Sequence, residues 1–199
     1  MKFPNFEKQE LKDILISTLA LGFIFTYPQL NFTILSIYTI VIAFSFIPHE
    51  LAHKFAAMKY GAYARFEMFK QGLIFALVLA VVTNGGFVFA APGAVMIYTQ
   101  FRSHAGIHQI KITQKDNAFI SAVGPGINIA IALLFVIVSF LFPGGFMAVI
   151  ASVIVRVNVF LALFNLLPIM PFDGSKIYAW NKSIWFLMAG FVFLLWQII

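Results

Sequence analysis

The sequence predicts an all-α polytopic membrane protein with about five transmembrane helices and a small, partly membrane-embedded re-entrant or β element between the second and third spans. Of the 199 residues, 62% are hydrophobic and only 10% are charged, whereas about a quarter of the residues in a soluble domain are charged. The apolar residues also stand in long blocks of the length that crosses a bilayer. We find no internal repeat, and we predict one membrane-embedded domain over residues 1–199.

The composition excludes several kinds of site and partner. Cysteine is absent, so disulfide bonds and thiolate metal sites are excluded. The net charge of +6 is better explained by basic loops beside the spans than by nucleic-acid binding, because cytoplasmic loops collect Lys and Arg. The first residues, MKFPNFEKQELKD, are mixed in charge and are not typical of a cleavable signal peptide.

Five apolar segments are predicted to span the membrane. If the N-terminus is cytoplasmic, three loops face the cytoplasm and hold most of the Lys and Arg, whereas the turns near residue 31 and at 143–145 hold none. This asymmetry follows the positive-inside rule and predicts a multi-pass protein of the cell membrane. The three basic loops are 59–70, 99–116 and 174–183, and the predicted spans are about 11–30, 32–58, 117–142, 146–167 and 184–199.

The segment between the second and third spans is predicted to enter the membrane and return. Leu73–Thr83 is apolar, but at about 1.5 Å per residue it is too short for a hydrocarbon core of about 30 Å. The run NGG at 84–86 breaks the pattern, and Gly86–Tyr98 is rich in β-branched and aromatic residues, which favours a strand. Pro92 cannot donate to a ladder, so it marks an edge strand or a bulge. Backbone at membrane depth must be covered by protein or by a wet cavity.

The stretch FIPHELAHKF at 46–55 places a candidate metal site in the second span. His49 and His53 are four residues apart, so a helix brings both imidazoles to one face, where they can bind one cation. Glu50 lies beside them and points near the open coordination position. Zinc held by two His and one more protein ligand activates a water molecule, and Glu50 can accept its proton and pass it to a leaving amine. Histidines that merely reach lipid headgroups are the alternative, but ionisable groups within a span are costly and mark function.

Asp173, in the stretch NLLPIMPFDG at 165–174, is the predicted third ligand. Pro168 and Pro171 prevent the fourth span from continuing as a helix, so the resulting loop can direct a carboxylate back at the bundle. The second and fourth spans both run towards the cytoplasm, which places Asp173 at the same end as the two histidines. His104 and His108 are also four apart, but they lie in a polar loop and are the weaker candidates.

Three motifs together resemble a known family. HELAH in one span, GPGIN at 124–128 in a later one, and NLLPIMPFDG after the next are similar to the motifs of the site-2 proteases, the intramembrane zinc metalloproteases of peptidase family M50. The resemblance covers a catalytic core of about residues 33–180. It implies that His49, His53 and Asp173 bind one zinc ion and that Glu50 is the general base.

The resemblance also implies how a substrate would bind. Asn128 and Asn165 match family positions near the active site and would orient the substrate backbone or the reacting carbonyl; the alternative is hydrogen bonding and close packing between helices. The family uses a partly embedded β element, to which GGFVFAAPGAVMI is similar. An edge strand can pair with an extended peptide, although such an element could instead only fill the bundle.

The sequence departs from many family members, and other functions compete. It has no room for a PDZ or CBS domain and resembles a minimal prokaryotic or archaeal type. One competing function is that of a catalytically silent pseudoprotease that binds transmembrane helices. Such a protein would typically have lost Glu50 or a metal ligand, whereas this sequence keeps all four residues. A metal carrier would need polar residues on the outer side, where Arg156 and Asn158 stand alone. Arg156 lines a wet cavity with Asn158, binds a substrate carbonyl, or snorkels to the outer surface. The expected partners are a transmembrane protein substrate and the bilayer; an oligomer is left open.

Overall fold

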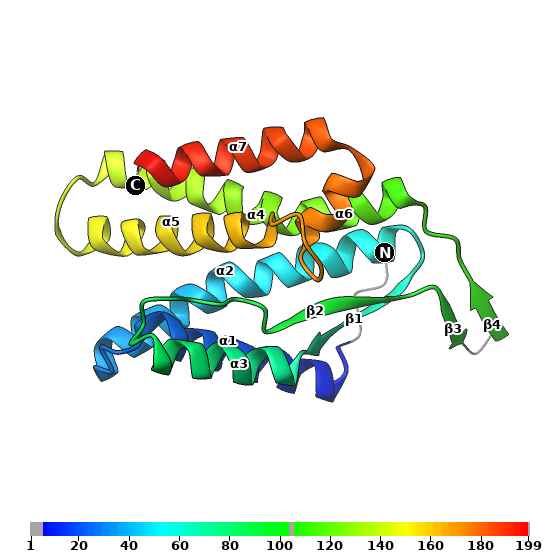
Figure 1. The fold of residues 1–199 in the computed structure, drawn as a ribbon, viewed down its shortest axis with the longest axis horizontal. Helices are drawn as coiled ribbons and strands as arrows, with labels where there is room; N and C mark the ends of the chain where they lie inside the picture. The colour runs from blue at the N-terminus through cyan, green and yellow to red at the C-terminus, as the bar shows by residue number, and fades with distance from the viewer. Residues whose placement is uncertain (1–5, 104–105, 199) are drawn as a thin grey trace.

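The computed structural model describes residues 6–103 and 106–198, which form a helical protein with a small amount of sheet (Figure 1). Helices α4, α5 and α7 lie on one side, helices α1 and α3 on the other, and α2 and β2 run between them. The helices are α1 (Lys8–Thr26), α2 (Phe32–Lys59), α3 (Lys70–Val82), α4 (Gln114–Leu141), α5 (Gly145–Asn165), α6 (Asp173–Trp180) and α7 (Lys182–Ile198). The strands are β1 (Tyr63–Met68), β2 (Gly93–Tyr98), β3 (Gln100–Ser103) and β4 (Gly106–Gln109).

Within residues 6–103 and 106–198, three helices are long and apolar enough to cross a membrane: α2, α4 and α5. The prediction of about five spans is therefore supported for three. Helix α1 has charged residues in its first two turns, Glu10 and Asp13 among them, and α7 has only 17 residues, or about 25 Å at 1.5 Å per residue. Neither qualifies by length and composition alone.

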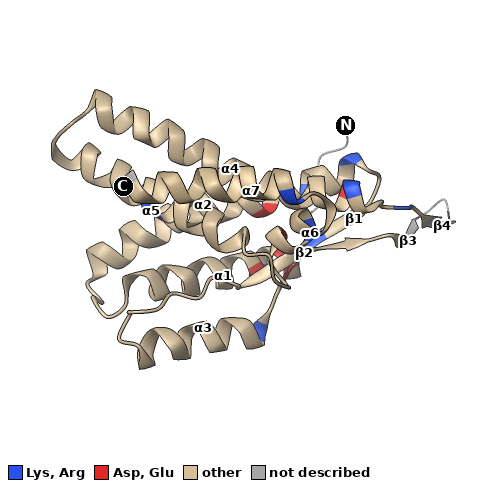
Figure 2. Cartoon of the chain, turned by 45° about the horizontal axis from the view of Figure 1, so that its top comes forward, with Lys and Arg blue, Asp and Glu red and all other residues tan. Residues whose placement is uncertain are grey.

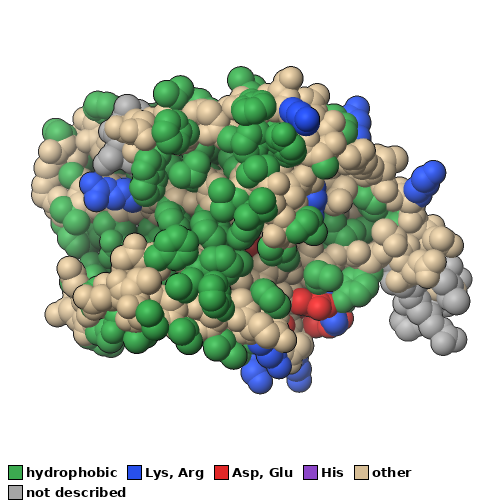
Figure 3. Space-filling model, in the orientation of Figure 1, with side chains coloured by type: hydrophobic (Ala, Val, Ile, Leu, Met, Phe, Trp, Pro, Cys, Tyr) green, Lys and Arg blue, Asp and Glu red, His purple; other side chains and the backbone are tan. Residues whose placement is uncertain are grey.

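The surface fits a membrane environment. Large apolar side chains cover the face seen in Figure 3, and Phe32, Phe140 and Val82 are 84%, 80% and 76% exposed. Water-soluble monomers rarely expose so much contiguous apolar area. Charged residues gather at the end that holds β1, β2 and α6, while the opposite end has few (Figure 2). This is the charge asymmetry that the sequence predicts; the cytoplasmic placement of the charged end remains a prediction.

The chain between β1 and β2 leaves the sheet and returns to it. The N–H of Phe69 donates to the carbonyl of Pro92 at 2.9 Å, which ties the two ends of the excursion together. Its far turn contains Asn84 and Gly85, both at positive φ. A Cβ at Gly85 would lie 2.2 Å from the carbonyl oxygen of Tyr27, so only glycine fits this contact. Helix α3 is thus half of a hairpin that leaves the sheet and returns to it, which we call the re-entrant hairpin; its entry into a membrane remains a prediction.

Two strand predictions need correction. The strand predicted at 86–98 begins only at Gly93, because Pro92 has no N–H for the ladder. It pairs antiparallel with β1, in register Tyr63 with Tyr98, and β1 was predicted only as part of a basic loop. The polar loop predicted at 99–116 contains a second pair, β3 with β4. Its residue His104 lies outside the described residues, as does the side chain of His108.

Two apolar cores share helix α5 and leave room between them for a site. One joins α1, α2, α3 and β1 around side chains such as Leu21, Ile42 and Phe66. The other joins α4, α5 and α7 around Val155, Leu166 and Val192. The polar residues discussed next lie where the two halves meet.

Candidate metal centre

Helix α2 and the start of α6 bring three potential metal ligands together. The Nε2 atoms of His49 and His53 are 3.0 Å apart. Oδ2 of Asp173 lies 3.0 Å from Nε2 of His53 and 3.6 Å from Nε2 of His49. Among the residues that the structure describes, these three form the group that could hold a metal ion. The sequence-predicted ligands therefore converge, although Asp173 is separated from His53 by most of the chain.

The spacing of the three atoms suits zinc. A tetrahedral ion with bonds of about 2.0–2.1 Å places neighbouring ligand atoms roughly 3.3–3.4 Å apart. The three observed separations, 3.0, 3.0 and 3.6 Å, bracket that value. Two imidazoles and one carboxylate also leave the fourth position of a tetrahedral ion for water or substrate, which is the arrangement of catalytic zinc sites.

The other ring nitrogens fix the orientation of both histidines. Nδ1 of His49 lies 2.5 Å from Oδ1 of Asn128, and Nδ1 of His53 lies 2.7 Å from the carbonyl oxygen of Ile120. Both partners are acceptors, so we assign the N–H to Nδ1 in each ring. Each Nε2 is then left with its lone pair towards the shared space. Metal-binding histidines are oriented in this way by a second hydrogen bond.

Helix α4 can approach the histidines because its motif GPGIN contains a glycine at the contact. A Cβ at Gly124 would lie 2.2 Å from Nε2 of His53 and 2.8 Å from Cε1 of His49. At Gly126 a Cβ would meet nothing within 4 Å. A side chain at the first glycine would therefore clash with the two histidines, whereas the second glycine has space for one.

Asn128 belongs to a buried network that joins three helices. It is fully buried, and its Nδ2 donates to the carbonyl of Ser45 at 3.0 Å and to Oδ1 of Asn158 at 2.8 Å. Asn158 in turn donates to Oγ of Ser45 and to the carbonyl of Ile154, both at 2.8 Å. Asn128 thus contacts His49 and links helices; its role in binding substrate remains a prediction. Both of its amide hydrogens are used within the protein.

The loop before α6 holds Asp173 by close backbone packing. A Cβ at Gly174 would lie 2.1 Å from the carbonyl oxygen of Leu166, so glycine lets α6 begin directly against the end of α5. The same carbonyl accepts a 2.7 Å hydrogen bond from Nε1 of Trp185. Nζ of Lys176 lies 3.5 Å from Oδ1 of Asp173, the oxygen that does not face the histidines.

The electrostatic surroundings favour the ionised form of Asp173. Burial by itself raises the pKa of this carboxyl group. When protons and not a metal ion occupy the Nε2 atoms, the charge of His53 and hydrogen bonds from both imidazoles outweigh burial, so the net shift of the pKa is downward. The ionised carboxylate is the form that binds a cation.

A cavity of about 460 Å³ opens beside the three ligands. Glu50, which is only 7% exposed, lines this cavity together with the ligands. Residues 90–97, which include most of β2, also line it. Asn165 also lines the cavity, and its Nδ2 donates to the carbonyl of Leu161 at 2.9 Å. Its side-chain oxygen remains a candidate for contact with a bound substrate.

Other polar residues lie elsewhere or were not predicted. Arg156 lines a separate cavity of about 400 Å³ with Phe25, Phe160 and Trp196. Asn158 is not beside it in a wet cavity but in the buried network described above. The role of Lys176 was not predicted, because DGSK reads as a turn; the signal was its position three residues after Asp173, one helical turn away.

The chain resembles one curated protein along nearly its whole length. It is 39% identical over 186 residues to a protein of Methanocaldococcus jannaschii named "Putative zinc metalloprotease", and the match covers 93% of this chain and 91% of the relative. No protein-family model matches the chain, and no solved structure matches it. The zinc in the relative's name agrees with the chemistry of the three ligands.

Proposed function

The chain belongs to the same zinc metalloprotease family as this archaeal relative, and on that premise we propose that it is an intramembrane protease of the site-2 type, in peptidase family M50. One observation carries the proposal: the metal ligands, a buried glutamate and an extended strand line the same cavity within an apolar helical bundle. A protease needs these three parts together, one for each of metal binding, proton transfer and peptide binding.

Each residue of the site then has a role in peptide hydrolysis. His49, His53 and Asp173 would hold zinc, which supplies a Lewis acid that lowers the pKa of water and polarises a carbonyl. Glu50 accepts the proton of the attacking water and delivers it to the leaving amine. His49, Glu50 and His53 are buried, so charges at the site interact more strongly than in solution. Lys176 balances the second oxygen of Asp173.

Strand β2 has an edge on which an unwound substrate segment can pair. The N–H groups of Phe66 and Met68 donate to carboxylates of helix α1 and not to β2. In an antiparallel ladder, paired residues alternate between bonded and non-bonded, so their partners on β2, Val95 and Gly93, are non-bonded pairs. Val95 and Ile97 therefore direct their N–H and C=O groups to the opposite edge, which can accept a third strand.

The expected substrate is a transmembrane segment. A helix keeps its peptide bonds hydrogen-bonded, so it must unwind before hydrolysis, and the β2 edge provides replacement partners for its backbone. The basic end of the molecule would face the cytoplasm of the cell membrane, with the N-terminus and the active site towards that side.

Reconstitution of the purified chain with a transmembrane substrate tests the proposal. Wild-type protein should cleave, and Glu50→Gln should keep one zinc per chain but lose cleavage by at least about a hundredfold, since removal of a general base commonly costs about 10²–10⁴. Glu7→Gln, at an exposed glutamate, is the matched control. Zinc transport into liposomes that survives Glu50→Gln would instead indicate a carrier. Wild-type binding without cleavage would indicate a pseudoprotease.

A further inference from the structure

Helix α1 presents a polar stripe to the backbone of the sheet. Glu10, Asp13 and Ser17 share one face and are 2%, 8% and 0% exposed. Oε1 of Glu10 accepts from the N–H of Phe66 at 3.1 Å, and Oδ2 of Asp13 accepts from the N–H of Met68 at 3.3 Å. The two carboxylates thus cover the outer edge of β1. Among the described residues, the β1–β2 sheet has no third strand, so its remaining edge is that of β2.

Ser17 completes the stripe beside the residue that precedes β2. Its Oγ donates to the carbonyl of Pro92 at 3.5 Å, next to the start of β2. Helix α1 therefore contacts β1 and the residue before β2, at the end where the re-entrant hairpin leaves the sheet. The signal in the sequence is three polar residues at helical spacing, ExxDxxxS.

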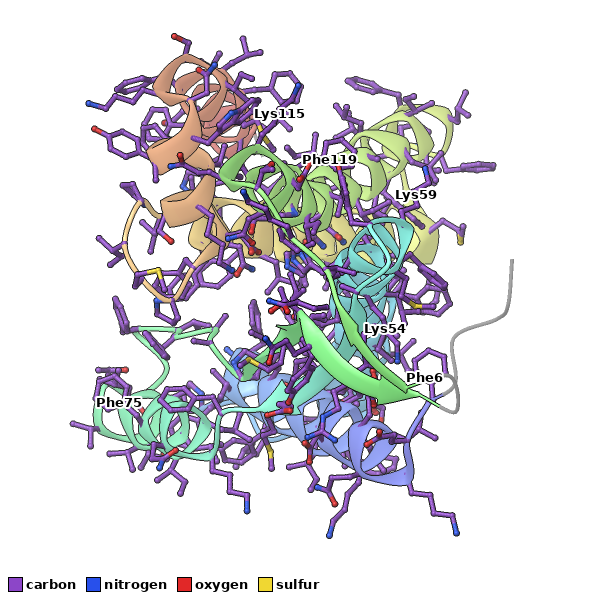
Figure 4. The ribbon with its side chains drawn as sticks, turned by 90° about the vertical axis from the view of Figure 1, so that its right-hand side faces the viewer. Phe6, Lys54, Lys59, Phe75, Lys115 and Phe119 are labelled. Atoms are coloured by element: carbon purple, nitrogen blue, oxygen red, sulfur yellow. The ribbon has the colours of Figure 1, made fainter. Side chains whose placement is uncertain are left out.

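A buried ion pair connects this stripe to the metal-bearing helix. Nζ of Lys54 lies 2.6 Å from both carboxylate oxygens of Glu10, and Lys54 is only 3% exposed. Lys54 directly follows His53 on α2. Figure 4 shows its side chain on the side of α2 that faces α1, near Phe6, whose ring centre lies 4.1 Å from Nζ. Glu10 consequently joins the β1 backbone to the residue next to a metal ligand.

Stability alone does not account for such a pair. Burying two charges costs desolvation free energy, and well-packed apolar residues of similar volume are often equally stabilising. What the pair adds is a fixed position, because a charge-assisted hydrogen bond is short and directional. The position matters here, since displacement of a substrate by about 1 Å can cost about a hundredfold in rate.

We propose that Glu10 and Lys54 are positioning residues that set the distance between the open edge of β2 and the metal site, so that a substrate strand added to β2 brings its scissile peptide to the ligands. The inference rests on the proposed function, because it assigns the pair a part in the same reaction. Asp13 assists by holding β1 at Met68.

The test uses the double variant Glu10→Gln/Lys54→Met, which removes both charges and leaves neither one unpaired in the core. Lys12→Met, an exposed lysine on the same helix, is the matched control. Because the chain has no cysteine, spin labels can be placed at Phe55→Cys on α2 and Met96→Cys on β2, which are 48% and 46% exposed. Pulsed EPR then measures the distance between helix and strand without any substrate.

The expected result is a broadened or shifted distance distribution in the double variant, with zinc content unchanged. Cleavage of a transmembrane substrate should fall at least about tenfold in kcat/KM, mainly through a higher KM, while Lys12→Met matches wild type in every measurement. A folded, zinc-loaded double variant with wild-type cleavage, or with a wild-type distance distribution, overturns the proposal. If wild-type protein cleaves no substrate but the distance distribution still changes in the double variant, the proposed protease function fails. The inference that the Glu10–Lys54 pair fixes the position of β2 relative to α2 then stands.

Discussion

Nδ1 of His49 on helix α2 lies 2.5 Å from Oδ1 of Asn128 on helix α4. This contact links two helices whose motifs, HELAH and GPGIN, are far apart in the sequence. The side-chain amide of Asn128 donates one hydrogen to the carbonyl of Ser45 and the other to Oδ1 of Asn158. The orientation of one metal ligand therefore depends on a network that spans α2, α4 and α5.

Asn128→Ala should weaken zinc binding by about 10–100-fold, because loss of the partner that orients a histidine ligand typically has this effect. Competition between the protein and a fluorescent zinc chelator measures the affinity. Ser139→Ala, on the same helix but hydrogen-bonded only to Val136, should leave the affinity unchanged. An Asn128→Ala protein that binds zinc like wild type but has a higher KM would return the residue to the substrate-binding role.

Gly124→Ala and Gly126→Ala should differ sharply although they change the same motif. The first places a methyl group 2.2 Å from Nε2 of His53, whereas the second meets nothing within 4 Å. We expect loss of zinc and of activity for Gly124→Ala, and unchanged or slightly higher stability for Gly126→Ala, because alanine is favoured over glycine in a helix by about 1 kcal/mol. Zinc content and thermal unfolding in detergent check both. Equal behaviour of the two variants would contradict the close approach of α4.

The metal centre could be predicted from sequence because its residues obey local rules. Four-residue spacing puts His49 and His53 on one helical face, and the two prolines force the turn that carries Asp173. The long apolar helices α2, α4 and α5 were predictable for the same reason, because a continuous apolar run of about 20 residues or more indicates a transmembrane helix.

What the sequence did not reveal depends on tertiary contacts. Strand β1 alternates polar and apolar residues, and its sequence was interpreted as a basic loop because its partner strand lies beyond α3. Helix α6 begins at Asp173 within a stretch whose glycine suggests a turn. The stripe of α1 was overlooked because Glu10 and Asp13 resemble ordinary charges near a helix start, and only the fold shows them buried.

Acidification should destabilise the β1–β2 sheet through Glu67. A hydrogen bond from Tyr98, and to a lesser degree one from Arg65, lowers the pKa of Glu67 below its ordinary value of 4.5. A carboxylate with a lowered folded-state pKa stabilises the fold fully above the ordinary value, and this contribution is lost as the pH falls through the folded-state pKa. Tyr98→Phe should therefore lower the melting temperature at pH 7, and the difference from wild type should shrink below pH 4.5.

The control for this prediction is Tyr60→Phe, whose ring packs on Phe119. It should show no pH-dependent difference from wild type. Thermal unfolding in detergent across the acid range provides the measurement. A Tyr98→Phe deficit that stays constant at every pH would mean that the hydroxyl acts through packing and not through the ionisation of Glu67.

Val95→Pro tests whether the open edge of β2 binds the substrate backbone. Proline removes the N–H that we place on that edge, and it leaves the ladder with β1 intact, since strand prolines are tolerated where the N–H faces away from a partner. Loss of one backbone hydrogen bond, at about 0.5–1.5 kcal/mol, should raise KM by about 2–10-fold with zinc content unchanged. Met96→Pro is the counterpart: it removes an N–H on the β1 side, opposite Arg65, and should lower the melting temperature as well. Wild-type kinetics in a folded Val95→Pro protein would show that substrate does not add to this strand.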